Sequence, residues 1–314
     1  MKTGLIAITI ACCLTAGAQA QDAKRIALTY DDAPREDTFL DGETRADMIV
    51  AGLAAAGVDQ AAFFITTDGI DSPVREQRVA DYAAAGHVLA NHSDTHPWLR
   101  ELDTDTYLAN IDTAEDKLAG FANRRAWFRY PYLNEAPDEA KRDAVRAGLA
   151  ERGLVNGYVT VDTWDWHLDS LFQQAKKDGK PVCMAALRKL YTDMLVEAAN
   201  FYDAAAREYL GRAPAQTMLL HENDMAAYFT ADLVAALEAD GWEIISADAA
   251  YEDPIAAVEP DTMFLGMGRV AALARLAGKP GPEFTYLASE GDEIDEAFAV
   301  TYDVTGTGNG LCPQ

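Results

Sequence analysis

The chain has 314 residues, of which 49% are hydrophobic and 25% are charged, so it contains enough apolar sequence for a substantial core. Its formal net charge is −25 and its sequence pI is about 4.4. An acidic surface of this kind argues against nucleic acid or an anionic membrane as a partner, because both carry negative charge. The length allows one large α/β domain or two smaller ones.

Residues 1–20 have the three parts of a secretory signal. Lys2 gives a positive start, residues 5–14 form an apolar run, and Ala-Gln-Ala at 18–20 is a cleavage site. The apolar run is too short to anchor the chain permanently in a bilayer. A core helix is the alternative, but its flanks fit export better. We therefore expect an exported protein, periplasmic or secreted, with no stable membrane span after cleavage.

Cleavage of the signal would leave two cysteines, Cys183 and Cys312. An oxidising compartment favours a disulfide between them, which would tie the C-terminal tail to the body of the protein. Two separate buried thiols are the alternative. The sequence leaves both open, because it does not give the distance between the two Cα atoms.

Strand and helix patterns alternate along the chain after the signal. The predicted strands are 25–30, 61–66, 87–90, 126–130, 158–161, 216–220 and 242–246. The predicted helices are 44–56, 73–86, 104–118, 137–152, 184–210 and 230–239. This rhythm predicts an α/β fold, a distorted (β/α) barrel of about seven parallel strands.

The same patterns predict one main domain over residues 21–252. Residues 253–314 are expected to form a C-terminal extension that packs on it, because this tail keeps apolar stretches between Gly, Pro and acidic clusters. The sequence indicates no task for the extension. The long helix at 184–210 carries an apolar stripe that is typical of core packing.

Chemically reactive side chains follow the predicted strands. His92 and His96 are four residues apart, a spacing that puts two imidazoles on one face of a helical turn and suits Zn²⁺. Adjacent carboxylates, Asp31 and Asp32, end the first strand. In a βα barrel the ends of the strands form the active-site face, so we expect these residues to meet there.

Five short stretches occur in order, each after a strand. They are Thr-Tyr-Asp-Asp at 29–32, His-Ser-Asp-Thr-His-Pro at 92–97, Arg-Tyr-Pro-Tyr at 129–132, Asp-Thr-Trp-Asp-Trp at 162–166 and Leu-Leu-His at 219–221. Together they resemble the motifs of the polysaccharide deacetylases, the carbohydrate esterase family 4 with the NodB homology domain. The resemblance extends from about residue 25 to residue 250, and five motifs in order are far more specific than one.

The resemblance implies a metal centre made by Asp32, His92 and His96. Two imidazoles and one carboxylate suit Zn²⁺ first and tolerate other transition metals. A bound ion would lower the pKa of a water molecule and polarise an acetyl carbonyl.

The resemblance also implies the residues that move protons. Asp31 would be the general base, with Arg129 holding it in place, although a surface salt bridge is the alternative for Arg129. His221 would be the general acid that protonates the departing amine, and Asp165 would keep it charged.

The remaining implied roles concern the substrate. The backbone N–H of Tyr132 would stabilise the oxyanion. Trp166 and Leu219 would line the pocket for the acetyl methyl group, and Trp98 and Trp164 would be sugar-stacking walls. For each tryptophan, core packing is the alternative. His87 reads as structural, and His167 lies beside the site without a role beyond a substrate contact.

One departure from the family pattern lies in the first motif. Ala33-Pro34 stands where the family usually has Gly-Pro. Because alanine resists positive φ, we expect this loop to differ, with consequences for substrate fit.

The sequence therefore predicts a metal-dependent hydrolase that removes N-acetyl, or O-acetyl, groups from an acetylated glycan. A catalytically silent carbohydrate-binding protein on the same scaffold is one alternative. An amidohydrolase of small non-sugar amides is another. The native polymer, the true metal and the oligomeric state are not indicated.

Overall fold

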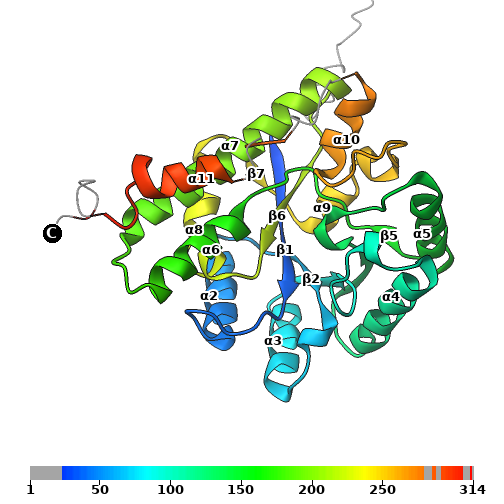
Figure 1. Ribbon diagram of the computed structural model, residues 1–314, viewed down its shortest axis with the longest axis horizontal. Coiled ribbons are helices and arrows are strands. Elements are labelled where there is room, and N and C mark those ends of the chain that lie inside the picture. The colour runs from blue at the N-terminus through cyan, green and yellow to red at the C-terminus, as the bar shows by residue number, and fades with distance from the viewer. Residues whose placement is uncertain (1–22, 279–284, 288–290, 307–311, 313–314) are drawn as a thin grey trace, which may run out of the picture.

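The computed structural model describes residues 23–278, 285–287, 291–306 and 312 (Figure 1). The predicted signal at 1–20 lies outside the described residues. The strands in the described part are β1 (Arg25–Ala33), β2 (Ala62–Ile65), β3 (Val88–Asn91), β4 (Arg124–Phe128), β5 (Val155–Asn156), β6 (Gln216–His221) and β7 (Glu243–Ile244).

Helices surround these strands (Figure 1). The α-helices in the described part are α2 (Gly42–Ala55), α3 (Pro73–Ala84), α4 (Thr104–Leu118), α5 (Glu139–Glu151), α6 (Asp165–Lys177), α7 (Met184–Leu210), α8 (Asp224–Ala239), α9 (Ala247–Tyr251), α10 (Gly268–Leu276) and α11 (Asp292–Glu296). Shorter helical turns are η1 (Thr67–Gly69), η2 (Leu99–Glu101), η3 (Pro131–Leu133), η4 (Pro254–Ala257) and η5 (Ala297–Thr301).

All strand pairs are parallel, in the order β5-β4-β3-β2-β1-β6, and β7 pairs with the start of β1. The segment that follows β4 and α5 connects the two edges of this sheet. Gly157 N–H donates to the carbonyl of Phe128 at 2.7 Å, and Val161 forms a bridge with Met218 of β6. The sheet therefore curls on itself, and the predicted α/β fold with a distorted barrel of parallel strands is confirmed.

The predicted strand at 158–161 is wrong. The regular strand is two residues long, Val155–Asn156, and lies earlier in the chain. The chain cannot stay paired with β4 beyond Gly157, because it crosses from that edge of the sheet to β6. Gly157 is required at the crossing, since a Cβ there would lie 2.4 Å from the Phe64 ring.

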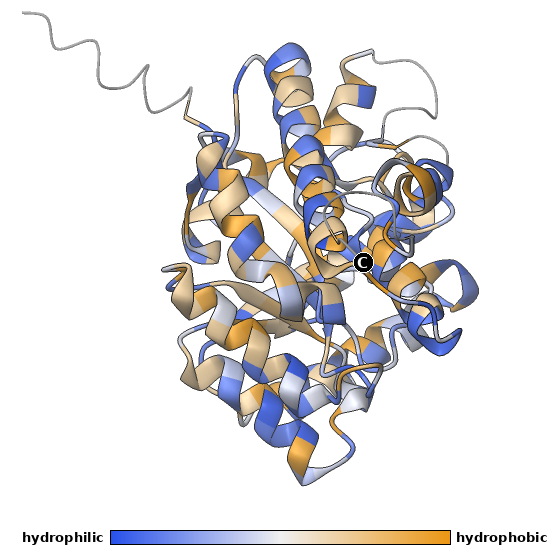
Figure 2. Ribbon diagram, turned by 90° about the vertical axis from the view of Figure 1, so that its left-hand side faces the viewer, coloured by the Kyte–Doolittle hydropathy of each residue, from blue (hydrophilic) through white to orange (hydrophobic). Residues whose placement is uncertain are grey.

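The core forms around β1, whose residues are almost all buried. Tyr30 stacks on Phe63 of β2 with ring centroids 5.0 Å apart, and Phe63 stacks on Tyr82 of α3 at 4.0 Å. Each such aromatic ring contributes about 1.5–3 kcal/mol by leaving water. The helices carry alternating polar and apolar residues, as expected for elements with one face on a core (Figure 2). This packing fixes the carboxyl ends of the strands.

Two helices differ from the prediction. The helix predicted at 230–239 begins at Asp224, because Asn223 accepts the N–H of Ala226 as its cap. Helix α6 was not predicted. It begins within the motif at 162–166 at Asp165, and Trp164, the residue before it, provides no side-chain cap.

The C-terminal extension contacts the main body through α7. Helix α10 packs against α7, and Cys183, at the start of α7, forms a disulfide with Cys312 with Cα atoms 5.8 Å apart. The structure thus contains the disulfide that the sequence left open. In the part of the chain that the structure describes, no helix is both long enough and apolar enough to span a bilayer.

Candidate active site

The carboxyl ends of the strands surround a cavity of about 420 Å³. It is lined by Asp31, Asp32, Arg35, His92, His96, Tyr132, Leu133, Asp162, Thr163, Trp164, Trp166, Leu219, His221, Gly266 and Met267. Ligand pockets of enzymes have similar volumes and a similar mix of apolar walls with few polar groups. The five motifs of the sequence therefore meet at one cavity.

Asp31 and Arg129 form a buried ion pair at the floor of this cavity. Arg129 Nη1 lies 2.6 Å from Asp31 Oδ1, and both side chains are almost completely buried. Arg129 also donates to Thr29 Oγ1, to the carbonyl of Gly157 and to Tyr251 Oη. An exposed salt bridge is thus excluded, and a guanidinium with four partners holds one orientation of the carboxylate.

Burial and Arg129 act in opposite directions on Asp31. Burial disfavours the charged carboxylate and outweighs the attraction of Arg129, so the pKa of Asp31 is raised to about 6. The free oxygen, Oδ2, lies 3.5 Å from His92 Nε2. The pKa of Asp31 is therefore closer to neutral pH than the pKa of an exposed aspartate.

Asp32, His92 and His96 form the group in the described chain that could hold a metal ion. Asp32 Oδ1 lies 3.5 Å from His92 Nε2 and 3.4 Å from His96 Nε2. Two ligands of one tetrahedral Zn²⁺ with bonds near 2.0–2.1 Å are about 3.3–3.4 Å apart. The spacing of the three atoms therefore fits a shared ion.

A hydrogen bond to His92 and the burial of both imidazoles set the protonation of this cluster. His92 Nδ1 lies 2.9 Å from the carbonyl of Arg129, which assigns the proton to Nδ1 and leaves Nε2 as an acceptor facing Asp32. Burial lowers the pKa of His92 and of His96 to about 4. Burial also opposes ionisation of Asp32, but the nearby histidines outweigh it and lower its pKa to about 2. Neutral imidazoles and an ionised carboxylate are the forms that bind metals.

The two histidines reach this geometry without a helix, contrary to the prediction from their spacing. They lie on an irregular loop after β3, in which Ser93 and His96 have positive φ values of 71° and 51°. Asn91 Oδ1 accepts the N–H of Ser93 at 2.7 Å, and Ser93 Oγ accepts the N–H of His96 at 3.0 Å. Side chains therefore supply the bonds that a helical turn would make through its backbone.

His221 and Asp165 lie on the other side of the cavity. His221 is the last residue of β6 and pairs in register with Asp31 of β1. Its Nδ1 lies 2.7 Å from Asp165 Oδ1, and its backbone N–H donates to Asp165 Oδ2 at 2.8 Å. Burial lowers the pKa of His221, but the Asp165 carboxylate outweighs it and raises the pKa to about 9. His221 is therefore protonated at neutral pH, with Nε2 left for the cavity.

Aromatic side chains form the rim of the cavity. Trp166 and Tyr132 are 45% and 56% exposed, which is unusual for such large rings, and Trp164 lies 5.4 Å from Trp166. Leu219 lines the wall and is almost fully buried. Trp98 is not among the described residues that line the cavity; it packs behind Tyr132, with ring centroids 5.1 Å apart.

Two further histidines lie outside the cavity lining. His87 Nδ1 accepts the N–H of Ala61 at 3.2 Å, and burial lowers the pKa of His87 to about 4. A neutral imidazole that accepts a backbone hydrogen bond fits the structural role expected for this residue. His167 Nε2 pairs with Asp295 of α11 at 2.7 Å.

The loop after β1 differs from the expectation for Ala33. Ala33 does not have positive φ; Asp32 does, at 69°, and the Ala33–Pro34 peptide is cis. A buried carboxylate then fixes the loop, since Glu222 Oε2 accepts the N–H of Arg35 at 2.6 Å. Alanine at position 33 therefore carries no positive-φ strain.

Six lining residues were not assigned to the site from the sequence: Arg35, Leu133, Asp162, Thr163, Gly266 and Met267. Asp162 and Thr163 belong to one motif, and Leu133 and Arg35 lie within three residues of two others, so an extension of each motif by a few residues would have included them. Gly266 and Met267 belong to the C-terminal extension, where the sequence carries no comparable signal.

Comparisons with known proteins bear on the family and the fold. The family model described as polysaccharide deacetylase matches residues 18–151. No curated protein matches the chain. The chitin deacetylase from the fungal pathogen Colletotrichum lindemuthianum is 19% identical with a TM-score of 0.51, covering 74% of this chain and 90% of that chain.

Another solved structure with the same fold is a carbohydrate esterase family 4 pseudoenzyme from Bacillus anthracis, 17% identical with a TM-score of 0.51, covering 74% of this chain and 66% of that chain. At such identities the likeness concerns the fold. The resemblance to the polysaccharide deacetylases that the five motifs indicated is therefore confirmed, over residues 18–151 by the family model and over the curled sheet by the fold.

Proposed function

We propose that the protein is an exported, metal-dependent deacetylase that removes N-acetyl groups from a glycan. The observation that carries the proposal is the convergence of three units at one cavity: the Asp31–Arg129 pair, the Asp32–His92–His96 cluster and the His221–Asp165 pair. Hydrolysis of an amide needs a base, an electrophile and an acid, and each unit has the chemistry of one of them.

Asp32, His92 and His96 would hold the divalent ion, Zn²⁺ or another transition metal. Such an ion acts as a Lewis acid on a carbonyl and lowers the pKa of water. The fit rests on ligand atoms 3.4–3.5 Å apart and on the Nε2 of His92, which faces Asp32 because Nδ1 is bonded to the Arg129 carbonyl.

Asp31 would take the proton from the attacking water. Its pKa of about 6 leaves it ionised at neutral pH but basic enough to accept a proton, and Arg129 keeps Oδ1 occupied so that Oδ2 is free for this step. The oxyanion that forms on the acetyl carbonyl would lie near the backbone N–H of Tyr132, in the left-handed turn η3.

His221 would donate its Nε2 proton to the departing nitrogen. An amine is a poor leaving group unless it is protonated, so an acid that is still charged at neutral pH is needed. Asp165 maintains that charge, and the acetyl methyl group would face Trp166 and Leu219. In the overall reaction, the hydroxyl group of the water molecule ends on the acetate and its remaining hydrogen on the free amine.

Export is part of the proposal. The signal predicted at 1–20 supports it, and so does the Cys183–Cys312 disulfide, because structural disulfides persist in oxidising compartments.

Acetate release from a panel of acetylated glycans, with the metal content measured on the same sample, tests the proposal. We expect release from N-acetylglucosamine oligomers that a chelator abolishes and added metal restores. Tight glycan binding without release would favour the silent carbohydrate-binding protein. Turnover of small amides without any glycan turnover would favour the amidohydrolase.

A further inference from the structure

The C-terminal extension contributes to the wall of the cavity, although it lies beyond the five motifs. Gly266 and Met267 line the cavity together with the Trp164 and Trp166 rim. Both residues lie outside residues 18–151, the part of the chain that the family model matches, and after the last of the five motifs.

The two residues after Met267 tie this segment to Val159, in the stretch of chain between β5 and α6. The N–H of Arg269 donates to the carbonyl of Val159 at 2.7 Å. Gly268 has a φ of 82°, and a Cβ there would lie 2.9 Å from the same carbonyl, so only glycine allows this approach.

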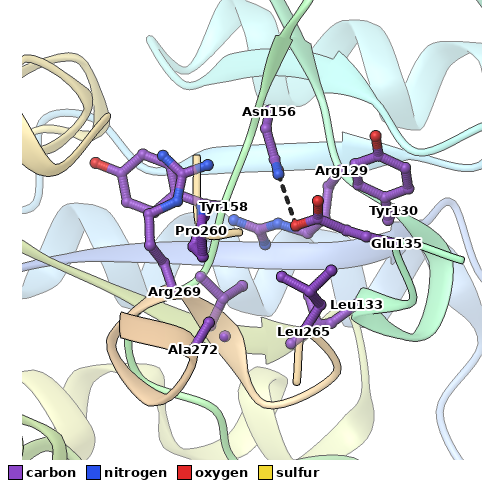
Figure 3. Close-up of a pocket in the computed structure, with 12 residues that line it drawn as sticks. Arg129, Tyr130, Leu133, Glu135, Asn156, Tyr158, Pro260, Leu265, Arg269 and Ala272 are labelled. Carbon is purple, nitrogen blue, oxygen red and sulfur yellow. Dashed lines mark hydrogen bonds between the residues drawn. The ribbon is translucent and has the colours of Figure 1, made fainter. Parts of the chain in front are cut away.

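Arg269 anchors the segment that contains Met267. Its side chain is buried and donates from Nη1 to the carbonyls of Ile255 and Ala256. Its guanidinium lies 4.1 Å from the centre of the Tyr158 ring, and Figure 3 shows it along that ring, next to a smaller cavity that Leu265 also lines. The position of Met267 is therefore set by the fold and not by a loose tail.

The extension also supports the tryptophan rim from outside. Trp164 Nε1 donates to the carbonyl of Tyr286 at 3.1 Å. His167, one residue after Trp166, pairs with Asp295, and the disulfide at Cys312 fastens the end of the extension to α7. The C-terminal extension thus lines the cavity with Gly266 and Met267 and also supports the tryptophan rim.

We propose that the C-terminal extension completes the substrate pocket, with Met267 in contact with the sugar that bears the acetyl group. The inference rests on the proposed function for the identity of the ligand. An unbranched thioether in the same cavity lining as two indole rings gives an adaptable apolar surface for the face of a sugar ring. Met267 is then a specificity-determining residue that acts on binding and not on the chemical step.

The test compares Met267→Trp and Met267→Ala with the wild-type protein. The ligand is the N-acetylglucosamine tetramer, and the measurements are KM and kcat for acetate release and the Kd from calorimetry on chelator-treated protein. Leu276→Trp is the matched control, because it adds the same indole to a half-exposed position of the extension outside the cavity lining. Thermal unfolding checks that each variant is folded.

We expect Met267→Trp to raise KM and Kd by at least about tenfold with kcat within about threefold, as loss of uniform binding requires. Met267→Ala should change KM in the same direction, and Leu276→Trp should change nothing. Unchanged KM and Kd in folded Met267→Trp would overturn the inference.

The calorimetric Kd separates this inference from the proposed function. If the wild type binds the tetramer without releasing acetate, and Met267→Trp weakens binding, the inference holds and the proposed function fails. If the wild type neither binds nor hydrolyses the tetramer, both fail.

Discussion

Two sides of the cavity use buried histidines in opposite ways. On the ligand side, made by Asp31, Asp32, His92, His96 and Arg129, burial keeps the imidazoles neutral. On the acid side, made by Asp165 and His221, the imidazole is charged.

The difference lies in the partner of Nδ1. His92 Nδ1 faces the carbonyl of Arg129, which fixes the tautomer without adding a charge. His221 Nδ1 faces the buried carboxylate of Asp165, which reverses the effect of burial. A histidine side chain is thus suited to bind a metal or to act as an acid according to the group that faces its Nδ1.

Loss of the base should have the largest effect. Asp31→Asn keeps the shape of the side chain and removes its proton affinity, so we expect kcat to fall by about 10³–10⁴-fold. Metal content should remain, because Asp32, His92 and His96 are untouched. Asp232→Asn, at a half-exposed position on α8, is the control. Turnover within tenfold of the wild type would remove Asp31 from the mechanism.

Loss of the acid should have the next largest effect, and it should depend on the leaving group. We expect His221→Gln to reduce kcat on N-acetyl substrates by about 10²–10³-fold. O-acetyl substrates should be less affected, since an alkoxide leaves more readily than an unprotonated amine. Equal losses on both substrates would argue against a role in protonating the leaving group.

Removal of the carboxylate that distinguishes the two sides should shift the pH profile. Because the pKa of His221 is raised to about 9, its acid form is present below that pH and is lost as the pH rises through it. Asp165→Asn removes the charge that raises this pKa, and burial then lowers it. We expect the alkaline limb of kcat/KM to move from about pH 9 to lower pH, with about a tenfold loss at pH 8. An unmoved limb would show that another group controls it.

The smallest expected effect concerns the residue that joins the ligand side to the sheet. Arg129→Lys keeps a positive charge near Asp31 but cannot reach all four acceptors of the guanidinium. We expect the free energy of unfolding to fall by about 1–3 kcal/mol, because a buried acceptor loses its donor. A denaturant titration measures this, and kcat should fall by about tenfold as Asp31 loses its fixed orientation. A variant as stable and active as the wild type would contradict this role.

The strand positions, apart from 158–161, and most of the residues that line the cavity were predictable from the sequence. Apolar runs that are buried on both faces, such as β2, leave a pattern that local sequence reveals. The motif residues lie at strand ends, so a parallel sheet brings them together in almost any curled arrangement.

Other features depended on contacts between distant segments. The chain could not be expected to leave β4 at Gly157, because the cause is the ring of Phe64 almost a hundred residues earlier. The loop that carries His92 and His96 is shaped by side-chain bonds from Asn91 and Ser93 and not by helical periodicity. Met267 lines the cavity two residues before Arg269, whose guanidinium packs on the ring of Tyr158, a residue more than a hundred positions earlier. Such positions follow from tertiary packing, which local patterns do not encode.

Zinc titration by calorimetry into chelator-stripped protein tests the ligand side most directly. The wild type should bind one ion per chain, and His96→Ala should weaken binding by at least about 100-fold because the ligand set is incomplete. His167→Ala, which alters a histidine outside the cluster, should bind as the wild type does. Unchanged zinc affinity in His96→Ala would contradict the account.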